Sequence, residues 1–90
     1  MASTRLVTLH KNLRIDEWVD RVHRLTDHDG CAALWAKPTA YRRQRRIANE
    51  LVAAGFDVNI LGRGSGRILT VAPPGEGVFW RGDGRPVWAG

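Results

Sequence analysis

The sequence has 90 residues and a net charge of +5, and 43% of its residues are apolar. This length and composition predict one small folded domain, 1–90, and exclude a chain that is disordered throughout. There is no apolar run of transmembrane length, no signal-peptide pattern and only one cysteine, Cys31. We therefore expect a protein of the reducing cytoplasm, with no membrane partner and no internal disulfide.

The chain begins with a predicted strand and a predicted helix. Arg5 to His10 alternates in character and predicts a short strand. From about Leu13 to His28, apolar side chains recur at helical spacing, and Gly30 follows as a residue suited to end a helix. Acidic and basic residues balance on the polar side of this helix, which indicates an ordinary solvated face.

The segment Cys31 to Lys37 is too short for its periodicity to distinguish a helix from a buried strand. This ambiguity decides the fold, because the segment lies between the two most strongly predicted helices. Both alternatives therefore stay open.

A second helix is predicted from Pro38 to Gly55. Proline is favoured at a first helical position, and Thr39 is a candidate N-cap. At the other end, Gly55 followed by Phe56 predicts a Schellman ending.

The remainder of the chain predicts strands. Asp57–Leu61 and Ile68–Ala72 should form a hairpin joined by a flexible basic loop, 62–67. A weaker hairpin is predicted from Val78–Arg81 and Arg85–Trp88, with Pro86 confining the last segment to an edge. This C-terminal hairpin, 76–90, is a candidate appendage to the domain.

The fold class is α+β, with two principal helices and one or two hairpins. If Cys31–Ala36 is a short helix, the order of elements resembles that of winged-helix DNA-binding proteins, in which a helix enters a groove and a basic hairpin touches the backbone. If it is a strand, the order is β-α-β-α-β-β, which predicts a small sheet with helices packed on it. The basic helix is then still exposed on one side, and the expected function is RNA binding or docking against another protein.

The strongest candidate for a binding site is the cluster of arginines in the second helix. Helical spacing places four polar residues on one face, with Arg43 beside them. These four are Arg42, Arg45, Arg46 and Asn49. Arginine pairs well with phosphate and with guanine, and asparagine with adenine. Arg63 and Arg67 in the predicted hairpin loop are expected to join Arg43 in contacting phosphates.

Other sites are excluded by their patterns. The spacing of His10, His23, His28 and Cys31 matches no zinc motif. The glycines of 62–66 precede a strand instead of a helix, which argues against a nucleotide-binding loop. No catalytic motif is present, so we expect neither an enzyme nor a cofactor.

The sequence therefore predicts a nucleic-acid-binding module, regulatory or architectural, with DNA favoured over RNA and a nucleoid-associated location. The alternative is a small interaction or inhibitor protein, such as a phage or mobile-element accessory factor, that docks on an acidic surface of a partner. In that case Trp80 and Trp88 are candidate anchors. The oligomeric state is left open.

Overall fold

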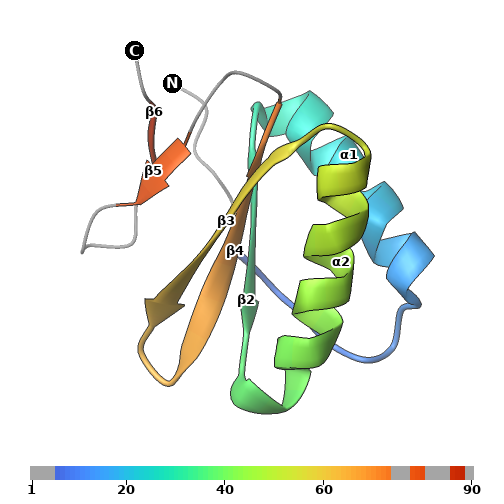
Figure 1. Cartoon of the computed structure of the whole chain (residues 1–90), viewed down its shortest axis with the longest axis vertical. Helices are drawn as coiled ribbons and strands as arrows, with labels where there is room; N and C mark the ends of the chain where they lie inside the picture. The colour runs from blue at the N-terminus through green and yellow to red at the C-terminus, as the bar shows by residue number, and fades with distance from the viewer. Residues whose placement is uncertain (1–5, 74–77, 81–85, 89–90) are drawn as a thin grey trace.

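The computed structural model describes residues 6–73 and the backbone of 78–80 and 86–88 (Figure 1). Its elements, in chain order, are β1 (Leu6–Thr8), α1 (Ile15–Asp29), β2 (Ala32–Ala36), the 3-10 turn η1 (Pro38–Ala40), α2 (Tyr41–Ala53), β3 (Asp57–Arg63), β4 (Gly66–Ala72), β5 (Val78–Trp80) and β6 (Pro86–Trp88). The predicted α+β class is confirmed.

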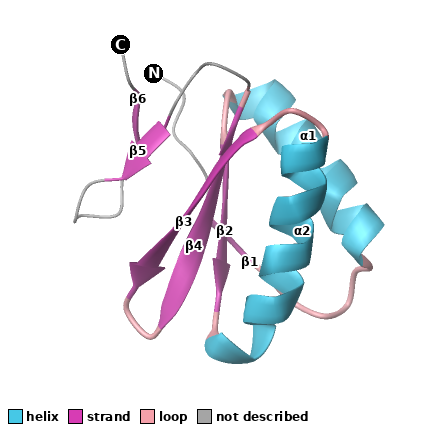
Figure 2. Cartoon of the chain, viewed as in Figure 1, coloured by secondary structure: helices cyan, strands magenta, loops and turns pink. Residues whose placement is uncertain are grey.

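Four of the strands form one mixed sheet in the order β1-β2-β4-β3. β1 runs parallel to β2, and the other two pairings are antiparallel. Both helices lie on the same side of this sheet (Figure 2). β5 and β6 pair with each other as a separate antiparallel hairpin, which lies on the side away from the helices and contacts β4 (Figure 1).

The segment whose structure decides the fold is a strand. Ala32–Ala36 pairs with β1 on one side and with β4 on the other, so it lies inside the sheet. The β-α-β-α-β-β alternative is therefore the order found, and the winged-helix-like arrangement, which needs a helix here, does not form. The reason is tertiary: two neighbouring strands supply hydrogen bonds to a segment whose local pattern is neutral.

The main core fills the space between the sheet and the two helices. Trp18 and Val22 from α1 and Ile47 and Leu51 from α2 are all fully buried there. Leu34 of β2 faces them and is also fully buried. Burying side chains of this size stabilises the fold by about 1.5–3 kcal/mol each.

The two helices end as the sequence predicts. Gly30 caps α1 with a left-handed backbone, φ 84. Gly55, φ 95, and Phe56 close α2, and their amides donate to the carbonyls of Val52 and Leu51 at 3.0 Å each, as in a Schellman motif. The prediction of Thr39 as an N-cap is wrong, because Pro38–Ala40 forms η1 and the N-cap of α2 is Ala40, with no side-chain cap.

The hairpin of β3 and β4 is longer than predicted and its turn is shorter. The ladder continues to Arg63 opposite Gly66, so only Gly64 and Ser65 form the turn, with Gly64 at φ 58. The expected loop of six residues, 62–67, is wrong in its extent. Its two arginines belong to paired strands, and this changes where their side chains lie.

Candidate nucleic-acid interface

The orientation of α2 is fixed by a buried glutamine. Gln44 has no exposed surface, and its Nε2 donates to the Leu34 carbonyl at 3.0 Å and to the Arg67 carbonyl at 3.2 Å. Ile47, Ala48 and Leu51 bury the rest of the same side of the helix. The opposite side must therefore face solvent.

Four predicted site residues come together on that solvent side of α2. We call them the arginine face: Arg42, Arg45, Arg46 and Asn49, all of which are exposed. In the part of the chain that the structure describes, the three arginines make no salt bridge. Three positive charges within little more than one turn of a helix repel one another, so an external anion would relieve that repulsion.

Arg43 lies beside this face, as predicted, and is partly buried. Its guanidinium donates from Nη1 to the carbonyl of Leu13, in the loop that precedes α1, at 2.7 Å. This bond uses one of the five donors of the side chain. Arg43 therefore joins the loop before α1 to the first turn of α2.

Arg67 has a structural position that the sequence analysis did not anticipate. Its Nε donates to Oε1 of Gln44 at 2.8 Å and its Nη2 to the carbonyl of Tyr41 at 3.1 Å. Its guanidinium carbon lies 3.9 Å from the centre of the Tyr41 ring. These contacts hold Arg67 against α2, so it serves the anchoring of the helix.

Arg63 is exposed at the end of β3, away from the arginine face. Its carbonyl accepts a hydrogen bond from the indole Nε1 of Trp35 at 3.3 Å. By the strand register its side chain shares a side of the sheet with Trp35, the side opposite the helices. The two arginines of the predicted loop are thus separated by the sheet.

The exposed side of α1 carries balanced charges, as predicted. Arg14 lies 3.2 Å from Asp16, and Arg24 lies 3.0 Å from Asp20. A shallow groove of about 620 Å³ runs between α1 and α2 and holds both Asp16 and Glu50 beside its arginines. Because Glu50 belongs to α2 itself, the purely basic part of this helix is limited to its first turns, before Glu50.

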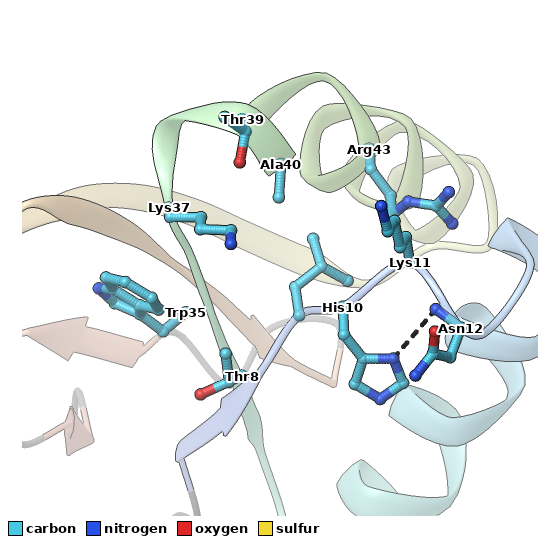
Figure 3. A pocket seen from close by; sticks show the side chains of 10 residues that line it. Thr8, His10, Lys11, Asn12, Trp35, Lys37, Thr39, Ala40 and Arg43 are labelled. Atoms are coloured by element: carbon cyan, nitrogen blue, oxygen red, sulfur yellow. Dashed lines mark hydrogen bonds between the residues drawn. The ribbon is translucent and has the colours of Figure 1, made fainter.

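A second basic site, which the sequence analysis missed, lies where β1 and β2 end (Figure 3). It is a pocket of about 740 Å³, which we call the strand-end pocket. Its lining residues are Thr8, Leu9, His10, Lys11, Asn12, Trp35, Lys37, Thr39, Ala40 and Arg43. None of them is acidic, and three carry a full positive charge.

A signal for this pocket was present in the sequence. The chain has two lysines against twelve arginines; Lys11 follows a predicted strand, and Lys37 ends the segment whose pattern is open between helix and strand. β1 and β2 are parallel, so their carboxyl ends meet at one edge and bring Lys11 and Lys37 together. That the two lysines line one pocket follows only from the parallel pairing, because local sequence patterns do not show which strands pair.

Comparison of the chain with protein-family models, curated proteins and solved structures found no match. The described residues contain no group of three or more histidine, cysteine or acidic side chains arranged to hold a metal ion. In the same part of the chain, neither helix has the length and apolar character needed to cross a bilayer.

Proposed function

We propose that this protein binds the phosphate backbone of nucleic acid, DNA in the first instance, through the arginine face of α2. The observation that carries the proposal is the set Arg42, Arg45 and Arg46 on the solvent side of a firmly anchored helix, with no salt bridge in the described part of the chain. Guanidinium groups bind phosphate through parallel hydrogen bonds.

The shape of the helical layer favours contacts to phosphates over contacts to base edges. The major groove of DNA is about 12 Å wide and admits a single helix. Here α1 packs beside α2 on the same side of the sheet (Figure 2). A layer of two helices is too broad to enter the groove, so the arginine face would lie across the backbone. The proposal is therefore an architectural or regulatory role with little sequence preference.

Two of the sequence-predicted phosphate contacts are assigned differently. Arg67 is left out of the interface because its guanidinium already binds Gln44 and Tyr41. Arg63 is left out because it lies at the end of β3, by register on the side of the sheet opposite α2. Arg43 stays at the margin of the interface, with one donor committed to Leu13.

The test is a fluorescence-anisotropy titration of a random 20-base-pair duplex DNA at low salt. The test variant is Arg42→Gln/Arg46→Gln, and the matched control is Arg14→Gln/Arg24→Gln on α1. Each pair lowers the net charge equally, from +5 to +3. We expect the test variant to bind at least tenfold more weakly than the control, because only the test variant removes phosphate contacts.

Equal weakening by both variants would show that net charge alone attracts DNA, and would refute the arginine face as the interface. Duplex RNA and single strands of both kinds are titrated in parallel. If any RNA binds more tightly than DNA, the arginine face remains the proposed interface and RNA replaces DNA as the proposed ligand.

A protein partner is the second candidate, favoured by exposed apolar residues on α2 and on the edge strand β3. Val52 of α2 and Ile60 and Leu61 of the edge strand β3 are exposed by 37–55%. An edge strand with exposed apolar residues can pair with another chain, and an acidic rim on that chain would meet the arginines. The side chains of Trp80 and Trp88, the anchors expected for this function, lie outside the described part of the structure. Failure of every nucleic acid to bind the folded protein would favour this candidate.

A further inference from the structure

The strand-end pocket has the charge of a site for an anion. Lys11 and Lys37 come from the segments that follow β1 and β2, and Arg43 comes from the first turn of α2. Trp35 and Lys37 lie on one side of the pocket, and Lys11 and Arg43 lie on the other (Figure 3). Thr39 lies between the two pairs in this view. No carboxylate lines the pocket, so an anion inside it would meet only positive and neutral groups.

The segment that carries Lys11 is held in place by the protein itself. The indole Nε1 of Trp18 donates to the His10 carbonyl at 3.1 Å, and Arg43 donates to the Leu13 carbonyl at 2.7 Å. The Leu9 amide also donates to the Trp35 carbonyl at 2.8 Å. These three bonds fix the backbone on both sides of Lys11. A site that is formed before its ligand arrives avoids the entropy of ordering a loop.

The two kinds of side chain in the pocket point to two parts of a ligand. Lysine and arginine are the residues that hold phosphates, lysine as a compact charge and arginine as a fork. Trp35 borders the same space, and its indole is fixed by the bond to the Arg63 carbonyl and by contact with Gly66. A fixed indole is a surface on which a nucleobase stacks.

We propose that the strand-end pocket binds a nucleoside phosphate. Its phosphate lies among Lys11, Lys37 and Arg43, and its base lies against Trp35. The pocket volume of about 740 Å³ is within the roughly 300–1,000 Å³ range of small-ligand sites. The ligand is either a free nucleotide or the phosphorylated end of a nucleic-acid strand, because both present the same chemistry. The pocket is a site separate from the arginine face, so the two proposals can fail independently.

The test is isothermal titration calorimetry of the full chain with five probes: adenosine monophosphate, adenosine, inorganic phosphate, a short single strand with a 5′-phosphate, and the same strand without it. The test variant is Lys11→Gln/Lys37→Gln, which removes both lysines of the chain. Arg14→Gln/Arg24→Gln has the same net charge and serves as the control. Arg42→Gln/Arg46→Gln is included to separate this pocket from the arginine face.

We expect adenosine monophosphate to bind at least tenfold more tightly than adenosine and than inorganic phosphate. The lysine variant should lose at least tenfold in affinity, whereas the control and the arginine-face variant should bind as the unaltered protein does. The 5′-phosphate could raise the affinity of the strand by a larger factor than the phosphate raises the affinity of adenosine. That result would identify a strand end as the natural ligand.

Three results would overturn the proposal. One is the absence of saturable binding of any phosphorylated probe. Another is equal affinity for adenosine monophosphate and inorganic phosphate, which would leave Trp35 without a role. The third is equal loss in the lysine variant and in the control, because that result assigns the binding to net charge.

Discussion

Gly66 is required because the neighbouring strand β2 leaves no space for a side chain at this position. A Cβ at this position would lie 2.6 Å from an indole carbon of Trp35 and would also collide with the Ala36 carbonyl. A Cβ added at Gly62, on the paired strand β3, would meet no atom within 4 Å, and Gly62 has no positive φ. The sequence alone assigns both glycines to a flexible loop, because the contact with Trp35 comes from the pairing of β2 with β4.

The two glycines therefore give a matched prediction. Gly66→Ala should lower the free energy of unfolding by about 1–3 kcal/mol, the range for an overpacked site. Gly62→Ala should change it by no more than about 0.5 kcal/mol. Urea denaturation followed by circular dichroism measures both values. Equal stability of the two variants would show that the Ala36 carbonyl and Trp35 do not crowd Gly66.

Arg67 gives a second prediction at this scale. Replacing it with methionine removes hydrogen bonds to Gln44 and Tyr41 and the contact with the Tyr41 ring. We expect a loss of about 1.5–3 kcal/mol in unfolding free energy, since bonds to a charged group are among the stronger ones. Arg42→Met, on the exposed face, should cost no more than about 0.5 kcal/mol. The same urea experiment decides between a structural and a solvent-facing Arg67.

At the scale of elements, the sequence predicts best what local chemistry determines. The apolar stripe of α2 and its ending at Gly55 and Phe56 are local features, and both are confirmed. The structure of Ala32–Ala36 depends on two partner strands that are distant in sequence, so local periodicity leaves it open. The strand-end pocket was missed for the same reason, because Lys11 and Lys37 meet only through the parallel pairing of β1 and β2.

The ending of α2 gives a prediction for this scale. Gly55 has φ 95, a conformation that side chains with a Cβ rarely adopt. Gly55→Ala should therefore cost about 1–2 kcal/mol in unfolding free energy, and Gly55→Asn should cost less, because asparagine tolerates this backbone better. Thermal or urea denaturation of the three proteins gives the order. An alanine variant as stable as the parent would contradict the Schellman ending.

At the scale of the whole molecule, the described surface has one region in which opposite charges pair and another in which positive charges make no salt bridge. Carboxylates and basic groups pair along α1, whereas the arginines of α2 make no salt bridge within the described residues. The strand-end pocket adjoins the start of α2 and shares Arg43 with its margin. A polyanion bound at the start of α2 would therefore lie next to the pocket, because Arg43 belongs to both regions.

The salt dependence of DNA binding tests the central claim most directly. The slope of log affinity against log salt concentration changes by about 0.9 for each phosphate contact. We predict that Arg42→Gln/Arg46→Gln makes this slope shallower by about two contacts, while Arg14→Gln/Arg24→Gln leaves it unchanged. Identical slopes for all three proteins, or binding that does not respond to salt, would contradict the account of α2 as a phosphate-binding helix.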